Sequence, residues 1–245
     1  MRSEATPFGV IAHRGISKGE PGNTQRAFRR ARELGVDAVE LDVRLTKDRE
    51  AAVHHDFMVS TDGLRPIFEL DAEDVRTSSV GDGERVPMLD QVLEEFAGTI
   101  GLEIELKGPE PEAADVIAPL LLAQRRSWDQ IEVTSFDGAL LLAIARRCPG
   151  IATALLVPAS EPWMTDDIVA YSSLHRARAA QATAVHLSAK QLTPRVAAFI
   201  RERGVEVHAH SVDDDAALRT ALECAIPWVC TNEPERALAF RRSLR

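Results

Sequence analysis

The chain of 245 residues has only three cysteines and no apolar run long enough to cross a membrane. Cys148, Cys224 and Cys230 show no paired spacing, and each has an apolar or small residue on at least one side. We therefore expect small buried side chains rather than metal ligands or nucleophiles. Apolar runs such as residues 116–123 fall far below the ~20 residues that span a bilayer, so no stable membrane insertion is expected.

The chain also lacks a basic excess and an N-terminal apolar stretch of the signal-peptide kind. Lysine and arginine number 29 against 38 aspartate and glutamate, a formal net charge of −9. This balance argues against nucleic acid as a partner, because such binding depends on basic contacts to phosphate. The net charge does not argue against a small phosphorylated substrate, because binding of such a substrate depends on the charges close to the site. We predict a cytoplasmic protein, whose oligomeric state the sequence does not reveal.

Short apolar or β-branched runs alternate with helical patterns along the chain. The predicted strands are Gly9–His13, Ala38–Leu45, Gly101–Leu106, Ile131–Ser135, Ala152–Val157, Thr183–Leu187, Glu206–His210 and Trp228–Thr231. The predicted helices are Thr24–Leu34, Leu89–Phe96, Pro111–Gln124, Gly138–Arg147, Asp166–Ala180, Pro194–Arg203, Asp214–Cys224 and Pro234–Leu244. Eight strand–helix pairs predict an α/β fold, a (β/α)₈ TIM barrel. No G-x-G-x-x-G follows the first strand, which disfavours a doubly wound open sheet.

One stretch, residues 46–87, interrupts this alternation. It is rich in turn residues and contains one predicted short strand, Ala51–His54. We interpret it as a small elaborated loop inserted after the second strand, at the mouth of the barrel, where loops build the active sites of such enzymes. No linker, repeat or low-complexity segment is evident, so residues 1–245 are predicted to form a single domain.

Two predicted strands carry charged side chains where a core should be apolar. The strand V-E-L-D-V-R-L contains Glu40 and Asp42 on one face, and G-L-E-I-E-L-K places Glu105 and Lys107 on one face of the next barrel strand. Burying unpaired carboxylates costs several kcal/mol, so these groups need a compensating cation. Three acidic oxygen donors beside a lysine suggest a divalent metal and an anionic substrate, and hence an enzyme. Local ion pairs are the alternative interpretation.

Histidines follow the first strand and lie in the mouth loop. His13 leaves the strand into a glycine-containing turn with Arg14 beside it, close enough to hold an oxyanion. The segment V-H-H-D supplies two more histidines, of which His55, followed by Asp56, fits a site better than His54. Taken alone, His13 could equally be structural and Arg14 a solvated charge. The coincidence of these features around one predicted barrel mouth favours a site.

These residues together resemble the glycerophosphodiester phosphodiesterase family. The resemblance covers nearly the whole chain in the right order, and its early elements are the more specific ones. The matching segments are H-R-G at 13–15, P-G-N-T at 21–24, E-L-D-V at 40–43, T-K-D at 46–48, H-D at 55–56, P-M-L at 87–89, E-L-K at 105–107, T-S-F-D at 134–137, residues 204–214 and T-N-E-P at 231–234.

The resemblance implies a (β/α)₈ barrel with one divalent cation and a small phosphodiester substrate. The implied metal ligands are Glu40, Asp42 and Glu105, whose hard oxygens suit Mg²⁺ or Ca²⁺ better than Zn²⁺. His13 and His55 are the implied acid/base pair. Three carboxylates against a dication leave about one negative charge, which gives Lys107 and Arg14 a role in holding phosphoryl oxygens.

The implied reaction is metal-dependent hydrolysis of glycerophosphodiesters to glycerol phosphate and an alcohol. One histidine removes the proton of the attacking hydroxyl and the other protonates the leaving alkoxide. We favour His13 as the base and His55 as the acid. The nucleophile is either water or a substrate hydroxyl that passes through a cyclic phosphate.

Three positions depart from the family pattern or need a separate interpretation. The family sequence P-E-N-T reads P-G-N-T here, and Glu20, two residues before Gly22, is a candidate substitute for the absent carboxylate. His210 stands where the family has tryptophan, and structural and substrate-contact roles are both open. Glu103 shares a strand face with Glu105 but lies deeper, so we expect a hydrogen-bonded residue of the barrel interior rather than a ligand.

Alternative functions also remain. A lysophospholipase-D-like activity would need an apolar mouth, for which the candidates, equally able to be core, are Phe57, Met58, Ile67, Phe68, Trp163 and Met164. A barrel that binds a phosphorylated ligand without turning it over is a second alternative. A phosphoinositide-cleaving barrel is a third, but no basic headgroup pocket is evident.

Overall fold

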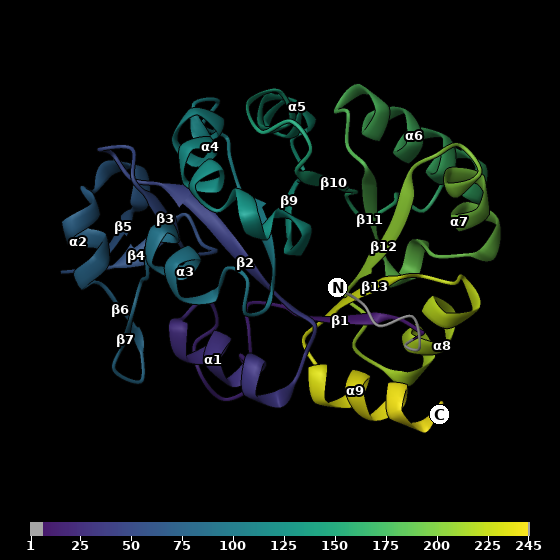
Figure 1. The fold of residues 1–245 in the computed structure, drawn as a ribbon, viewed down its shortest axis with the longest axis horizontal. Coiled ribbons are helices and arrows are strands. Elements are labelled where there is room, and N and C mark those ends of the chain that lie inside the picture. Colours follow the sequence, from purple (N-terminus) through teal and green to yellow (C-terminus); the bar gives the residue numbers. More distant parts are fainter. Residues whose placement is uncertain (1–6, 245) are drawn as a thin grey trace.

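In the computed structural model, which describes residues 7–244, parallel strands close into a barrel (Figure 1). The barrel strands are β1 (Gly9–Ala12), β2 (Ala38–Leu45), β8 (Gly101–Leu106), β9 (Ile131–Ser135), β10 (Ala152–Leu156), β11 (Ala184–Ser188), β12 (Glu206–His210) and β13 (Trp228–Thr231). They pair in the order β1-β13-β12-β11-β10-β9-β8-β2, and β2 pairs back to β1. The predicted (β/α)₈ barrel is therefore confirmed.

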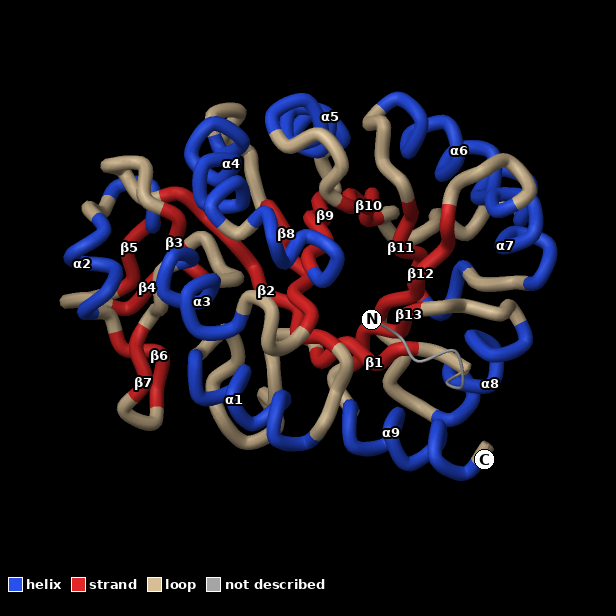
Figure 2. Tube along the Cα trace, viewed as in Figure 1, coloured by secondary structure: helices blue, strands red, loops and turns tan. Residues whose placement is uncertain are grey.

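Helices surround the strands as an outer ring (Figure 2). They are α1 (Gln25–Leu34), α3 (Leu89–Phe96), α4 (Ala113–Ala123), α5 (Gly138–Arg147), α6 (Asp166–Ala179), α7 (Pro194–Arg201), α8 (Asp215–Glu223) and α9 (Pro234–Ser243). Short 3₁₀ turns η2 (Arg125–Gln130) and η3 (Ala189–Gln191) precede or follow strands. The predicted helices agree with these to within about two residues at each end, the usual uncertainty of frayed termini.

Local sequence explains where several helices begin and end. Thr24 precedes α1, and its hydroxyl accepts a hydrogen bond from the backbone N–H of Ala27. Thr193 caps α7 in the same way, with Pro194 in the first turn. Gly35 ends α1 at a φ of 82°, a left-handed conformation that glycine adopts without strain. These caps satisfy backbone groups that the helix itself leaves unpaired.

The barrel strands separate an apolar outer face from a polar interior. Along β2, Val39, Leu41 and Val43 belong to the large hydrophobic core packed between strands and helices. The alternate residues Glu40 and Asp42 therefore face the barrel interior, because successive side chains of a strand point to opposite faces. Burial of the core drives folding, and the interior face is left to carry the charged groups.

The insertion at residues 46–87 is more ordered than predicted. After β3 (Ala51–Val53), which pairs antiparallel with β2, the structure has two hairpins and a short helix instead of turns alone. These elements are β4 (Met58–Ser60), β5 (Leu64–Pro66), η1 (Ile67–Glu69), α2 (Ala72–Thr77), β6 (Ser79–Gly81) and β7 (Glu84–Arg85). They enclose a small core of their own that includes Val59, Leu70 and Val75. The prediction was wrong about this interior because two- and three-residue strands carry no recognisable periodicity.

Several side-chain predictions can be compared with the structure. All three cysteines are buried and free, as expected. Of the proposed apolar mouth residues, Ile67 is core, whereas Phe57 and Trp163 are about half or more exposed, at 47% and 66%. Among the described helices, none combines the length and apolar character needed to traverse a bilayer.

Candidate active site

Three buried carboxylates meet inside the barrel near the carboxyl ends of β2 and β8. Asp42 on β2 is in register with Glu105 on β8, and Glu40 lies two residues before Asp42 on the same face. One oxygen from each of the three lies within 4.8 Å of the others. All three residues are at most 7% exposed. The structure thus brings together the three residues that the sequence analysis named as ligands.

Basic and amide groups surround Asp42. Lys107, directly after β8, places Nζ 2.8 Å from Asp42 Oδ1 and 2.8 Å from Glu105 Oε1. Arg14 Nε lies 3.0 Å from Asp42 Oδ2, and the side-chain amide of Asn23 donates a 2.7 Å hydrogen bond to the same oxygen. Lys107 and Arg14 therefore form ion pairs with the carboxylates themselves.

The balance of these contacts separates the pKa values of the three acids. Burial would raise the pKa of Asp42, but attraction to Lys107 and Arg14 outweighs it and the pKa is lowered. Burial and the negative charge of Asp42 raise the pKa of Glu40 well above its usual range. Burial likewise raises the pKa of Glu105, despite its contact with Lys107. The site therefore still favours additional positive charge, most strongly at Glu40.

A divalent cation fits this donor set. Glu40 Oε2 accepts a 3.0 Å hydrogen bond from the backbone N–H of Arg14, whereas the buried Glu40 Oε1 has no hydrogen-bond partner among the described residues. An ion held by Glu40, Asp42 and Glu105 would satisfy that oxygen and relieve the repulsion that raises the pKa of Glu40. Three carboxylate oxygens are hard donors, as Mg²⁺ and Ca²⁺ prefer.

His13 lies directly after β1 and is held by a short chain of hydrogen bonds. Its Nδ1 is 2.7 Å from Oδ1 of Asn232, and the Asn232 amide donates a 3.0 Å hydrogen bond to Asp213. Because that amide is committed to Asp213, the Asn232 carbonyl faces His13, and Nδ1 must carry the imidazole proton. The other nitrogen, Nε2, lies 3.8 Å from Glu40 Oε2 and keeps its lone pair.

The environment also keeps His13 neutral. Burial lowers its pKa, and the hydrogen bond to Asn232 only partly offsets this. Sequence reasoning missed the orienting roles of Asn232 and Asp213, whose segments had only a loose family match. The position of Asn232 immediately after β13 was the signal that could have found it, since strand ends converge at the mouth of a parallel barrel.

His55 comes from the insertion rather than from a barrel strand. Its Nδ1 is 2.7 Å from Asp56 Oδ1, and its backbone carbonyl accepts a 2.7 Å hydrogen bond from Arg44 Nε. Burial raises the pKa of Glu105, and attraction to Lys107 and His55 offsets part of this rise. His54 is engaged elsewhere, with Nε2 3.2 Å from the backbone carbonyl of Met58. The geometry thus favours His55 over His54 as the site histidine.

Glu20 does not replace the missing family carboxylate. It forms ion pairs with Arg26 and Arg30 on α1 and does not belong to the group of Glu40, Asp42 and Glu105. At Gly22 a Cβ atom would lie 2.9 Å from the Cβ of Arg14. A side chain at this position would displace Arg14. Glycine at position 22 therefore leaves the space that the contact between Arg14 and Asp42 needs.

His210 and Glu103 complete the comparison with the sequence. His210 ends β12, and burial together with nearby His186 and His13 lowers its pKa to about 4. Glu103 lies in the interior as expected and outside the carboxylate group. The expectation of hydrogen bonds was wrong for its buried Oε2, which has no partner among the described residues, while Oε1 lies 3.6 Å from His186 Nδ1.

The barrel and its rim of carboxylates, cations and oriented histidines define an enzyme of the TIM-barrel class. A profile of the glycerophosphoryl diester phosphodiesterase family matches residues 13–236. A glycerophosphodiester phosphodiesterase from Caldanaerobacter subterraneus subsp. tengcongensis is 28% identical, covering 95% of this chain and 97% of its own. Another from Bacillus subtilis is 25% identical, with 92% and 84% covered.

Solved structures show the same fold. A putative glycerophosphodiester phosphodiesterase from Galdieria sulphuraria superposes with a TM-score of 0.83 at 23% identity, covering 98% of this chain and 100% of that chain. An Oleispira antarctica phosphodiesterase, in complex with the product sn-glycerol-3-phosphate, gives 0.81 at 23% identity, with 95% and 96% covered. The chain belongs to the glycerophosphoryl diester phosphodiesterase family and is an enzyme that hydrolyses glycerophosphodiesters.

Proposed function

We propose that this enzyme cleaves water-soluble glycerophosphodiesters into glycerol phosphate and an alcohol, with Glu40, Asp42 and Glu105 holding one Mg²⁺ or Ca²⁺ ion. The observation that carries this proposal is the meeting of three buried carboxylates with the unprotonated Nε2 of His13, 3.8 Å from Glu40. The bound cation would polarise a phosphoryl oxygen and neutralise developing charge. Cytoplasmic action in glycerophospholipid and glycerol metabolism belongs to the same proposal.

His13 is the general base in this scheme. Its lone pair at Nε2 takes the proton of the attacking hydroxyl, which belongs to water or to the substrate glycerol, as a new P–O bond forms. The proton on Nδ1 stays in the hydrogen bond to Asn232, which is itself held by Asp213. This chain stabilises the imidazolium that results.

His55 is the general acid. Asp56 accepts the Nδ1–H hydrogen bond and orients the ring, and the side chain is 39% exposed at the mouth, where an alcohol can leave. His55 gives its proton to the alkoxide as the P–O bond to the leaving group breaks. Arg14 and Lys107 attract the phosphoryl oxygens, because their positive charges offset the excess of the three carboxylates.

The Oleispira antarctica relative supports the identity of the phosphorylated product, since its structure holds sn-glycerol-3-phosphate. A lysophospholipase-D-like activity is the second candidate. The exposed aromatic rings of Phe57, Phe68 and Trp163, at 47%, 48% and 66%, favour it if they receive an acyl chain. Glycerophosphocholine and lysophosphatidylcholine should be assayed side by side. Cleavage of the lysolipid alone would overturn the proposed substrate class.

The metal proposal is tested with chelator-treated enzyme. Hydrolysis should vanish in EDTA and return with excess Mg²⁺ or Ca²⁺, and whichever ion restores the higher kcat is assigned. Asp42→Asn should show no recovery at these concentrations, whereas Asp71→Asn, an exposed aspartate of the insertion, should recover fully. Activity that survives complete chelation would contradict the proposal.

A further inference from the structure

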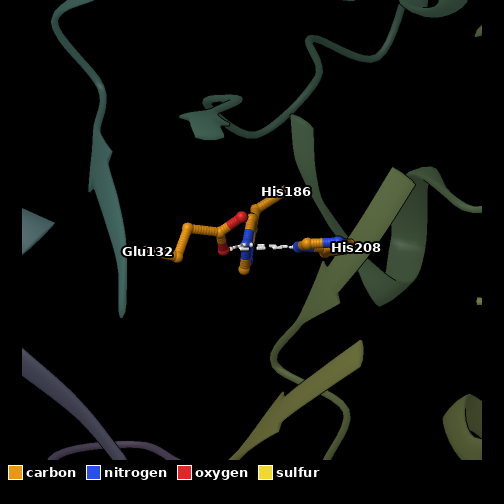
Figure 3. Close-up of side chains that lie close together, drawn as sticks. All are labelled: Glu132, His186 and His208. Carbon is orange, nitrogen blue, oxygen red and sulfur yellow. Dashed lines mark hydrogen bonds and ion pairs between the residues drawn. The ribbon is translucent and has the colours of Figure 1, made fainter. Parts of the chain in front are cut away.

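A second group of potential metal ligands lies at the opposite end of the barrel. Glu132, His186 and His208, here called the floor cluster, come from β9, β11 and β12 (Figure 3). A cavity of about 700 Å³ opens beside it. The cavity is lined by the first residues of several barrel strands, such as Gly101, Ile131 and Ala152, as well as by Glu132 and His208. It is therefore at the amino-terminal face of the barrel, away from His13 and the mouth.

The ligand atoms form a tight triangle. His186 Nε2 lies 3.0 Å from Glu132 Oε2 and 3.1 Å from His208 Nδ1, and the third side, from His208 Nδ1 to Glu132 Oε2, is 3.4 Å. Two ligands of a tetrahedral zinc ion, each about 2.05 Å from the metal, are separated by about 3.3 Å. The sides of the triangle are thus close to the spacing between two ligands of one zinc ion.

Hydrogen bonds to Glu132 leave the side between the two histidine nitrogens unsatisfied. Each imidazole nitrogen carries either one hydrogen or one lone pair. With hydrogens on His186 Nε2 and His208 Nδ1, both nitrogens can donate to Glu132 Oε2, but the two N–H groups then lie only 3.1 Å apart. A cation at the centre would satisfy all three atoms at once.

The outer nitrogens provide an independent observation. His208 Nε2 faces Glu206 Oε2 at 3.4 Å, whereas the buried His186 Nδ1 has no hydrogen-bond partner among the described residues and lies 3.6 Å from Glu103 Oε1. A carboxylate on the far nitrogen of a ligating histidine orients the imidazole in metal centres, and Glu206 has this position at His208. Both rings are almost fully buried, at 0% for His186 and 4% for His208. Neither histidine contributes to the proposed phosphodiesterase chemistry.

We infer that the floor cluster is a second metal site that binds Zn²⁺ through Glu132 Oε2, His186 Nε2 and His208 Nδ1, with one coordination position open to the cavity. Two imidazoles and one carboxylate suit zinc and similar borderline ions, in contrast to the all-oxygen group at the mouth. Because the ligands join three separate strands at the face of the barrel that governs stability, the ion stabilises the fold.

The test uses the chelator-treated full-length protein and two metals. Cobalt titration should produce the visible absorption of a tetrahedral N/O site, and Zn²⁺ should displace it. Zn²⁺ should also raise the melting temperature. In His208→Gln the affinity for both ions should fall by ~100-fold or more, and in Glu206→Gln, which changes the outer partner of His208, by about 10-fold.

Three controls separate this site from the mouth and from folding. His175→Gln changes an exposed histidine and should bind Zn²⁺ like the wild type. Asp42→Asn should lose Mg²⁺-dependent hydrolysis yet retain the cobalt spectrum, and His208→Gln should do the reverse. Should His208→Gln fail to fold, the spectrum of Glu206→Gln decides. Equal Zn²⁺ affinity in the wild type, Glu206→Gln and every folded floor variant would overturn the inference.

Discussion

The side-chain oxygen of Asn232 lies 2.7 Å from Nδ1 of His13, and so links the last barrel strand to the residue that follows the first. This contact assigns the imidazole proton to Nδ1 and leaves Nε2 as a base. Residues more than two hundred positions apart thus lie in contact because the barrel closes between β1 and β13.

The first prediction concerns the pH profile. Because burial lowers the pKa of His13, its imidazole should stay unprotonated at neutral pH. We therefore expect kcat/KM to stay constant until the pH falls below about 6.5. Asn232→Asp places a negative charge on Nδ1–H, favours the imidazolium and should move the acidic limb to higher pH. Asn232→Ala should lower kcat by about 10-fold or more with little change in KM.

These effects are read from kcat and kcat/KM for glycerophosphocholine between pH 5 and 9 in saturating Mg²⁺. Asp137→Asn, which alters the cap of α5 instead, is the matched control. An acidic limb that does not move in Asn232→Asp would show that His13 is not the titrating base.

The second prediction concerns stability of the metal-free protein. The pKa of Glu40 is raised on folding, so this carboxyl prefers to be protonated in the folded state. Its favourable contribution is complete below the unfolded pKa, about 4.3, and is lost as the pH rises through the raised folded value. The melting temperature should therefore fall with rising pH above about 5, and Mg²⁺ should reverse the fall.

Glu40→Gln should remove both effects and raise the metal-free melting temperature by about 2–4 °C, the change that about 1 kcal/mol produces in a chain of this size. Thermal melts with and without Mg²⁺ at several pH values provide the measurement. Glu69→Gln, at an exposed position, serves as control. If Glu40→Gln keeps the wild-type dependence on pH, the assignment to Glu40 is wrong.

The third prediction concerns Lys107. Its ammonium group is the cation closest to both Asp42 and Glu105, and its side chain is only 13% exposed. Lys107→Met leaves buried carboxylates uncompensated and should lower the metal-free unfolding free energy by about 3 kcal/mol. Mg²⁺ should recover part of this loss, while KM for the diester stays raised.

Denaturant unfolding with and without Mg²⁺ checks this change. Lys47→Met is the matched control, because Lys47 pairs with Asp71 at the surface, where its side chain is 61% exposed. That pair is expected to contribute at most about 1 kcal/mol. Equal losses in the two variants would show that Lys107 does not stabilise the carboxylate group.

The fourth prediction concerns the leaving alcohol. His210 is neutral at pH 7, since its pKa is lowered to about 4, and it stands where the family pattern has tryptophan. His210→Trp introduces an aromatic face that attracts a quaternary ammonium group by about 1–2 kcal/mol. The kcat/KM ratio of glycerophosphocholine to glycerophosphoglycerol should therefore increase by about 5- to 30-fold. An unchanged ratio would mean that His210 does not contact the alcohol.

Much of the architecture could be read from local patterns. Alternation of short apolar strands with capped helices predicted the barrel, because each strand and helix buries a face whose period is visible in a few consecutive residues. The sequence also pointed to Glu40, Asp42 and Glu105 as candidate metal ligands, because charged residues are unexpected in strands that are otherwise apolar. The interior of residues 46–87 could not be read, because its two- and three-residue strands are stabilised by contacts within the insertion rather than by a local pattern.

By itself the sequence determined the barrel, the polar face of β2 and β8, and the residue types available at the mouth. Only the tertiary structure decided which groups meet: Asn232 with His13, Lys107 between Asp42 and Glu105, and Glu132 with His186 and His208. The physical reason is that strand register and barrel closure set these distances. Both depend on hydrogen bonds between strands that are far apart in the chain, and they cannot be predicted from local sequence patterns.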